Sequence, residues 1–340
     1  MRSLVTGSSG LLGACLVERL RARGGPLRLL DMVPPPGGVP PGAEFVQVDM
    51  RDAAAVAAAC RDVEVVYHLA AGQRMKPQFG GMSEQEIFDM NLAAVRHVLD
   101  GARASGVRKV VHLSSSGVYG IPQTVPVGED HPQRPLGAYG HSKIAAERLC
   151  QDALAAGLDV TMMRPMSLFG PGMTGVFALL FEWVRLGKNV YLLGSGRNRV
   201  QMVSAWDVAD ACVLAAERPE SRGAVLNLGS GEVVSVREQV AALIAHAGSR
   251  SRIVPIPSVL LRNAGRALNL IGLSPIVPEH YLLADSTFVL DLTRARTLLG
   301  WEPRFSNVQL MIDAYEWYCR NLDRARTPPG LVLRLLNALS

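Results

Sequence analysis

The sequence predicts an α/β fold in which a doubly wound parallel sheet is followed by a smaller, mixed C-terminal domain. Short apolar runs alternate with helical patterns from the first residues onward, which is typical of strand–helix–strand units with helices on both faces of one sheet. A glycine-rich turn follows the first of these runs. The 340 residues are 49% hydrophobic and 19% charged, so the chain can fill a large core and a disordered protein is excluded.

Each expected strand is a short apolar run, and each expected helix is a longer run with apolar residues at helical spacing. The third helix begins with the capping box Ser83-x-x-Glu86. The expected strands are Arg2–Thr6, Leu27–Asp31, Glu44–Val48, Val63–His68, Lys109–Ser114 and Asp159–Arg164. The expected helices are Leu11–Ala22, Ala53–Cys60, Ser83–Ala104 and Tyr139–Ala156.

The pattern loosens after Pro165, and Gly170-Pro171-Gly172 marks a break in it. Beyond the break we expect helices at Val176–Arg185, Asp207–Glu217, Ser235–Ala247 and Val308–Asn321, with short strands such as Val225–Leu228 between them. The expected division is a first domain at 1–170 with segments returning to it near 200–230, a mainly substrate-binding domain at 171–325, and a tail at 326–340.

The segment Gly7-Ser8-Ser9-Gly10-Leu11-Leu12-Gly13 joins the first strand to the first helix. Backbone N–H groups approach a pyrophosphate closely only where side chains are missing, and a helix N-terminus adds partial positive charge at the same point. This position predicts a dinucleotide-binding Rossmann domain. The expected contacts in this segment are Gly7, Ser9, Gly10, Leu11, Leu12 and Gly13.

Asp31 ends the second expected strand. A carboxylate there accepts hydrogen bonds from the adenosine ribose hydroxyls and repels a 2′-phosphate. Neither of the next two residues, Met32 and Val33, is basic. The sequence therefore favours NAD over NADP as the cofactor.

Tyr139-Gly140-His141-Ser142-Lys143 places a phenol and an amine on one face at the start of an expected helix. A nearby ammonium lowers the pKa of a tyrosine from ~10, so the phenol can take the proton of a substrate hydroxyl while hydride leaves the same carbon. The preceding strand leads into the hydroxyl cluster 114–116, of which one serine is expected to bond the reacting oxygen. The alternative is a serine-rich loop that takes no part in chemistry.

Charge and cysteine content exclude several classes of partner. The net charge is +5, but acids are interleaved with the bases, so nucleic acid is not an expected partner. The five cysteines lie far apart with no C-x-x-C pair, which predicts neither a disulfide framework nor a metal site and fits a reducing cytosol. No stretch reaches the ~18 uninterrupted apolar residues of a membrane span. With a strand expected from Arg2 onward, no signal peptide is expected either, and the sequence predicts a cytoplasmic protein with a small-molecule substrate.

These motifs, in this order, resemble the extended short-chain dehydrogenase/reductase family, in particular its sugar-nucleotide epimerase and dehydratase branch, over roughly residues 1–322. The resemblance implies catalysis by Ser115, Tyr139 and Lys143. Because Ser114 and Ser116 flank Ser115 and a water can replace its hydroxyl, loss of that hydroxyl is expected to cost less than loss of Tyr139 or Lys143. The last two members of this triad would also hold the cofactor, and Asp291–Pro303 resembles the Asp…Leu-Gly-Trp-x-Pro ending of these enzymes.

The resemblance also implies contacts outside the triad. Asp49-Met50 resembles an adenine-contacting pair, and the segment beginning at His68 resembles the loop under the cofactor. The implied cofactor contacts are Asp49, Met50, Leu69, Ala70, Ala71, Gln73, Asn91, Ser114 and Met166, and the implied substrate contacts are Ser115, Ser116, Tyr139 and Ser167. Relatives pair through the helices that correspond to Ser83–Ala104 and Tyr139–Ala156, so a homodimer is expected.

The chain departs from the family pattern at two places. Sugar 4,6-dehydratases carry Asp-Glu directly after the active-site hydroxyl, whereas this chain has Ser116-Gly117, as 4-epimerases do. The family usually has a diphosphate-binding Arg where Val200 stands. Arg197 or Arg199 can substitute for it, because a guanidinium binds phosphate bidentately. These two arginines are equally compatible with a solvated turn.

Three functions follow from these expectations. The leading one is an NAD-dependent sugar-nucleotide epimerase that oxidises the sugar, at C4 by resemblance, lets the keto-sugar rotate and returns the hydride to the other face. The second is a net dehydrogenase or reductase of a hydrophobic, steroid- or lipid-like substrate. The third is an NAD-binding scaffold without catalysis, against which the intact triad argues.

Two apolar segments remain open in interpretation. Val259–Leu273 has helical spacing, which indicates either a helix packed on the core or an apolar lid over a lipid-like substrate. Leu331–Leu339 in the tail is a frayed end, a docking helix or a peripheral contact with a membrane surface.

Overall fold

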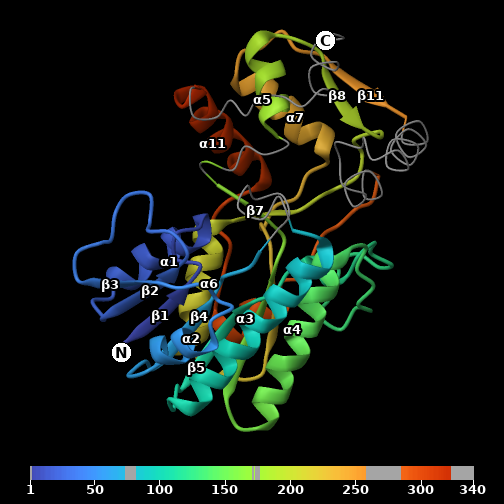
Figure 1. Ribbon diagram of the computed structural model, residues 1–340. Helices are drawn as coiled ribbons and strands as arrows, with labels where there is room; N and C mark the ends of the chain where they lie inside the picture. Colours follow the sequence, from blue (N-terminus) through green and yellow to red (C-terminus); the bar gives the residue numbers. More distant parts are fainter. Residues whose placement is uncertain (1, 73–81, 171, 173–176, 258–284, 323–340) are drawn as a thin grey trace.

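A seven-stranded sheet forms the centre of the computed structural model, which describes residues 2–72, 82–170, 172, 177–257 and 285–322 (Figure 1). The strand order is β10-β6-β5-β4-β1-β2-β3, and every neighbouring pair is parallel. The strands are β1 Ser3–Thr6, β2 Leu27–Asp31, β3 Ala43–Gln47, β4 Val65–His68, β5 Lys109–Leu113, β6 Asp159–Pro165 and β10 Val225–Leu228. The order reverses between β1 and β4, which is where ligands bind in such sheets. The expected doubly wound Rossmann sheet is confirmed.

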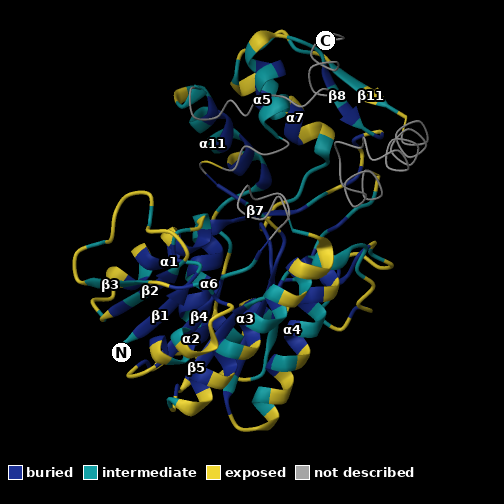
Figure 2. Ribbon diagram, in the orientation of Figure 1, coloured by how far each residue is buried: buried dark blue, intermediate teal, exposed yellow. Residues whose placement is uncertain are grey.

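Helices cover both faces of this sheet (Figure 1). On one face α1 (Leu11–Arg21) packs against α6 (Ala205–Glu217). The other face carries α2 (Ala53–Ala59), α3 (Glu84–Ala104) and α4 (Ala138–Ala155), with α3 packed against both of the others. Figure 2 shows the sheet buried between these two layers. Each layer closes one apolar cluster of the core.

The expected helices form nearly as the sequence predicts, and side-chain caps mark the starts of α2, α3, α6, α7 and α11. The capping box at Ser83 is present. Helix α6 begins earlier than expected, at Ala205, because the Ser204 hydroxyl accepts the N–H of Trp206 and so caps the helix before the first apolar repeat. Cys150 in α4 and Cys212 in α6 are buried.

A second lobe lies beyond the carboxyl ends of the strands (Figure 1). It contains the helices α5 Phe177–Leu186, α7 Val236–His246 and α11 Asn307–Arg320 and the parallel pair β8 Val190–Leu193 and β11 Ile253–Ile256. Aromatic rings fill its core, with Phe181 against Tyr315 and Tyr318. A second parallel pair, β7 Ser167–Phe169 and β9 Met202–Ser204, lies between the lobes. The domain limits at 170 and 325 stay a prediction.

Several short elements were not among the expectations. Strands β7, β8, β9 and β11 and helix α10 (Thr293–Leu299) are too short for their apolar residues to display a period. The expectations for Val259–Leu273 and for the 326–340 tail concern residues outside the described part of the chain, and the homodimer stays a prediction. Among the described residues, none of the helices combines the length and hydropathy that crossing a bilayer requires.

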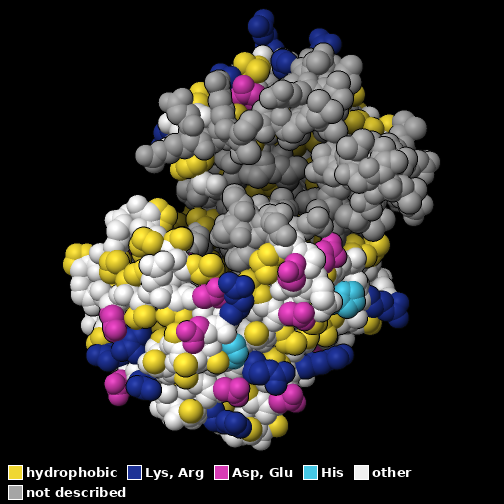
Figure 3. Space-filling view, in the orientation of Figure 1, with side chains coloured by type: hydrophobic (Ala, Val, Ile, Leu, Met, Phe, Trp, Pro, Cys, Tyr) yellow, Lys and Arg dark blue, Asp and Glu magenta, His cyan; other side chains and the backbone are white. Residues whose placement is uncertain are grey.

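Charged side chains are interspersed over the surface. On the face shown in Figure 3, basic and acidic side chains alternate over the sheet domain. This distribution follows the interleaving of acids and bases along the sequence.

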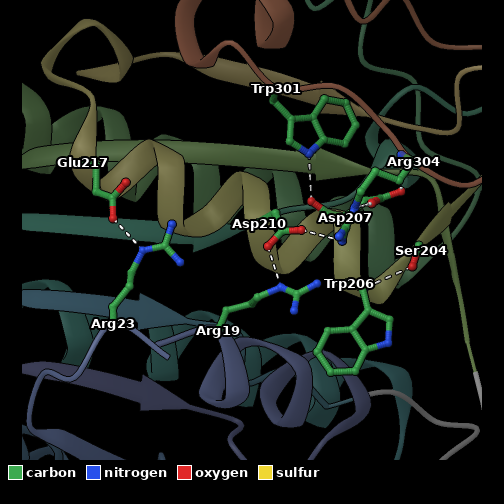
Figure 4. Close-up of polar contacts among 9 residues, drawn as sticks. All are labelled: Arg19, Arg23, Ser204, Trp206, Asp207, Asp210, Glu217, Trp301 and Arg304. Atoms are coloured by element: carbon green, nitrogen blue, oxygen red, sulfur yellow. Dashed lines mark hydrogen bonds and ion pairs between the residues drawn. The ribbon is translucent and has the colours of Figure 1, made fainter. Parts of the chain in front are cut away.

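The Asp207 carboxylate joins the C-terminal Trp301 segment to α6 (Figure 4). It accepts the Arg304 Nε–H at 3.1 Å and the backbone N–H of Arg304 at 3.1 Å, while Trp301 Nε1 donates to the Asp207 carbonyl at 2.8 Å. Burial raises the pKa of the Asp207 carboxyl, and the hydrogen bonds from Arg304 oppose that rise. These hydrogen bonds hold the end of the Asp291–Pro303 segment against α6 of the sheet domain.

We expect Asp207→Asn to lower the free energy of unfolding by about 1–3 kcal/mol, because one buried acceptor becomes a donor that faces N–H groups. Glu217→Gln in the same helix is the matched control, since its pair with Arg23 is exposed on both sides and such pairs contribute about 0–1 kcal/mol. Urea unfolding of the two variants measures both values, and equal losses would contradict the assignment.

Candidate active site

The glycine loop lies against the loop that follows β4. Gly7 has a positive φ of 71°. A Cβ atom added at Gly7 would lie 2.8 Å from the Ala70 nitrogen, and one at Gly13 would lie 2.7 Å from the Ser8 Cα. Both distances are shorter than real Cβ contacts, so these positions require glycine. No side chain caps α1 at Gly10, and the helix start is a backbone surface fit for a phosphate.

The structure brings Ser115, Tyr139 and Lys143 together at the end of β5. Ser115 caps a short 3₁₀ turn, Ser116–Val118, and its Oγ accepts the Gly117 N–H at 3.1 Å. A Cβ atom at Gly117 would lie 3.3 Å from Ser115 Oγ and 3.8 Å from the Tyr139 ring. The Lys143 Nζ lies 5.7 Å from the centre of that ring. The three side chains therefore lie close to one another at the end of β5.

Two contacts hold α4 against the end of β5. The Lys143 Nζ donates to the Leu113 carbonyl at 2.8 Å, and Lys143 is buried. A Cβ atom at Gly140 would lie 2.7 Å from the Gly117 carbonyl oxygen, so only glycine lets the helix approach the Ser115 turn. Sequence reasoning missed Gly140, although a glycine in the first turn of a helix is a costly choice that signals such a contact.

Ser114 and Ser116 do not share the surroundings of Ser115. The Ser114 hydroxyl is buried and donates to Glu147 Oε1 at 2.5 Å. Its proton is therefore committed to a carboxylate, and the smaller effect expected for loss of the Ser115 hydroxyl stays a prediction. Ser116 is buried within the 3₁₀ turn.

The remaining expected substrate residues, and the expected cofactor contact Met166, belong to segments that join the two lobes. Met166 is buried and Ser167 exposed at the crossing from β6 to β7. Exposure alternates along 197–200, with Arg197 and Arg199 exposed and Asn198 buried between them. Val200 packs on the sheet-domain core. Phosphate binding by the two arginines stays a prediction.

A model of the NAD dependent epimerase/dehydratase family matches residues 3–229. The chain belongs to this family. The uncharacterized protein y4nG of Sinorhizobium fredii is 36% identical over 322 residues, which make up 94% of this chain and 79% of that protein. The UDP-glucose 4-epimerase of Mycolicibacterium smegmatis is 31% identical over 338 residues, covering 94% and 98%. The structure of MoeE5 in complex with UDP-glucose and NAD has a TM-score of 0.73 at 28% identity, covering 95% and 100%.

The comparisons confirm an NAD-dependent enzyme, and the glycine loop fits that cofactor. The loop offers the backbone cradle that a pyrophosphate needs, and Asp31 lies beside it at the end of β2. The Asp31 carboxylate accepts the N–H of Ser9 at 3.0 Å and that of Met32 at 2.7 Å. These two bonds fix its orientation and leave further lone pairs for ribose hydroxyls.

Asn91 holds the loop under the cofactor site. Its side chain accepts the Gly72 N–H at 2.7 Å and donates to the Gly72 carbonyl at 3.1 Å. Thr6 Oγ1 accepts the Ala70 N–H from the same loop. Leu69 and Ala71 belong to this loop, whereas Gln73 lies outside the described residues. The amide of Asn91 is thus bonded to the backbone of this loop, and a cofactor contact by Asn91 stays a prediction.

Asp49 and Met50 lie at the end of β3. Arg51 donates to the Asp49 carboxylate at 2.6 Å, and these hydrogen bonds lower the pKa of the Asp49 carboxyl. The Met50 carbonyl is bonded by His97 Nδ1 at 2.9 Å, and the Met50 side chain is buried. Adenine contact by this pair stays a prediction.

Two histidines are buried beneath Lys143. His68 and His112 are opposite each other on β4 and β5, their rings stack at 5.4 Å, and Thr6 Oγ1 bonds His68 Nδ1 at 2.8 Å. Burial, with the Lys143 charge, lowers the pKa of His68 to about 3 and that of His112 well below its ordinary value. Both are strand residues, as expected, and both are uncharged in the folded protein.

This pair predicts acid lability. An unfolded histidine binds its proton near pH 6.5, whereas folded His68 does so only near pH 3 and the pKa of folded His112 lies well below its ordinary value. Stability is therefore complete above pH ~6.5 and falls as the pH drops toward the folded pKa, by about 1.4 kcal/mol per pH unit for each ring. His112→Phe should reduce the slope of unfolding free energy against pH by the contribution of one proton. Urea unfolding at several pH values between about 6.5 and 4 measures this slope. Identical slopes for His112→Phe and the parent would contradict the prediction. His246→Gln, on the surface, is the control.

We expect Asp31→Asn to reduce the preference for NAD over NADP by about 10- to 100-fold, since a charged hydrogen bond contributes about 1.5–3 kcal/mol. The amide oxygen can still accept the Ser9 N–H, whereas the bond from the Met32 N–H is lost. Calorimetric titration with both dinucleotides measures the ratio, and tighter binding of NADP by the parent protein would contradict NAD preference.

Proposed function

We propose that this chain is an NAD-dependent epimerase that inverts C4 of a UDP-sugar. The observation that carries the proposal is the Gly117 position, whose Cβ direction points between Ser115 Oγ and the Tyr139 ring. Dehydratases of the family carry an acidic side chain here. This chain has Ser116 and Gly117 there instead. The proton-transfer groups at this position are then Ser115 and Tyr139, which serve hydride transfer and not dehydration.

The side chains perform the acid–base part of that reaction. Tyr139 takes the proton of the C4 hydroxyl and returns it, and the Lys143 ammonium stabilises the phenolate electrostatically from its fixed place on the Leu113 carbonyl. Ser115 Oγ donates to the same substrate oxygen. Bound NAD supplies the hydride acceptor and donor, held by the glycine loop, Asp31 and Lys143.

The choice of UDP-sugar and of C4 is supported by the relatives. The Mycolicibacterium smegmatis relative is a UDP-glucose 4-epimerase, and MoeE5 binds UDP-glucose with NAD. Epimerisation returns the hydride to the same molecule, so NAD stays bound through many turnovers. A dehydrogenase of a hydrophobic substrate has to release reduced cofactor instead.

Mass spectrometry of nucleotides released from the purified, denatured protein tests this difference. We expect retained NAD, and conversion of UDP-glucose to UDP-galactose without added cofactor. Stoichiometric consumption of added NAD with accumulation of NADH would overturn the epimerase in favour of the dehydrogenase.

We expect Tyr139→Phe to reduce turnover by ~10²–10⁴-fold, the usual loss when general acid–base help is removed, while NAD stays bound. Lys143→Ala should lower turnover at least as much and should also weaken NAD binding. Arg148→Ala, at an exposed position of the same helix, is the matched control and should keep parental turnover. Near-parental turnover of Tyr139→Phe would contradict the mechanism.

A further inference from the structure

A buried carboxylate lies one helical turn beyond Lys143 and two turns beyond Tyr139, on the same face of α4. This residue, Glu147, is only 2% exposed. The hydrogen bonds of Glu147 go to neither Ser115 nor Tyr139, and the mechanism above does not use this residue. A carboxylate is buried at large cost unless several donors satisfy it, so its partners decide its role.

Each of the two carboxylate oxygens of Glu147 accepts two hydrogen bonds. The donors belong to three residues from three different segments. Oε1 accepts the Ser114 hydroxyl at 2.5 Å and Arg164 Nε at 2.8 Å. Oε2 accepts Arg164 Nη2 at 2.7 Å and Gln133 Nε2 at 2.8 Å. Ser114 follows β5, Arg164 belongs to β6, and Gln133 lies in the segment before α4. One carboxylate therefore connects the helix to both strands and to its own leading loop.

Arg164 is itself held in place. Its Nη1 donates to the Tyr119 hydroxyl and to the Glu129 carbonyl, both at 2.8 Å. Burial lowers the pKa of the Arg164 guanidinium, but the hydrogen bonds and charge of Glu147 outweigh that effect and keep the pKa above its ordinary value. A bidentate, fully buried pair of this kind fixes geometry more than it adds stability.

We infer that Glu147 is the positioning residue that sets the distance between Ser115 and the Tyr139–Lys143 pair. Lys143 bonds the Leu113 carbonyl and Glu147 bonds the Ser114 hydroxyl. Consecutive turns of α4 are thus tied to consecutive residues of the strand end, directly before Ser115. With both ties in place, α4 cannot slide or rotate relative to the Ser115 turn.

The inference rests on the proposed function for its kinetic part, but the ionisation of Tyr139 can be followed without any substrate. An ultraviolet pH titration of the NAD-bound protein, minus that of Tyr139→Phe, reports this one phenol. Loss of Glu147 has two opposite effects on it. Removing the negative charge favours the phenolate and lowers the ionisation midpoint, whereas moving Lys143 away raises it.

We expect Glu147→Gln to raise the midpoint by about one pH unit, since a charge within 4–6 Å shifts ionisation by ~1–3 units. A lower or an unchanged midpoint would show that displacement of Lys143 is not the dominant effect. Either result overturns the inference. With UDP-glucose as substrate, kcat should fall about 10- to 100-fold with KM nearly unchanged, as expected for misplaced catalytic groups.

Asp159→Asn is the matched control. Asp159 pairs with the buried Lys109 at 3.2 Å and joins β5 to β6 at their opposite ends. This variant should unfold at a lower temperature and keep the parental Tyr139 midpoint and kcat. An equal change in both variants would show that lost stability alone is responsible, and would overturn the inference.

Ser114→Ala covers the case in which Glu147→Gln fails to fold. It removes one tie without changing any charge. We expect a kcat about 10-fold lower with KM and NAD affinity unchanged, and parental kcat would overturn the inference. If UDP-glucose is not turned over by the parent protein, the proposed function fails while the titration still tests Glu147.

Discussion

Close backbone approach at the carboxyl edge of the sheet is the constraint on which the rest of the structure depends. At Gly7 and Gly13 the first loop folds onto itself and onto Ala70 so tightly that no side-chain atom fits. At Gly140 the same holds between α4 and the Ser115 turn. The cofactor cradle and the catalytic triad therefore arise from one physical condition, the absence of a Cβ atom at a few contact points.

The parts of the site that depend on neighbouring residues could be predicted from the sequence. The glycine loop, Asp31 and the Tyr139–Lys143 pair each follow from local spacing, and the structure brings all of them to the same edge. The fold followed from the alternation of apolar runs, because strand and helix periods are local properties.

Contacts between distant segments could not be predicted in this way. Ser114 sits in the same serine run as Ser115, yet its hydroxyl belongs to Glu147 on another element. The amide of Asn91 is bonded to the backbone of Gly72, which lies 19 residues earlier in the chain. Short elements such as β8 and β11 exist only because they pair with each other. In each case the partner is remote in sequence, so no local pattern indicates it.

The return of the chain to the sheet has a consequence for biosynthesis. Helix α1 packs against α6, and β6 pairs with β10 on the edge that β5 leaves free. The first helix therefore obtains its helix neighbour, and the sixth strand its second strand neighbour, only after residues 205–228 have been made. Until then the growing chain exposes the apolar faces that these elements later cover, which is the condition under which partly folded chains associate. The residues of the catalytic edge are therefore synthesised early, but α6 and β10, which pack on the elements that carry them, are synthesised only later in translation.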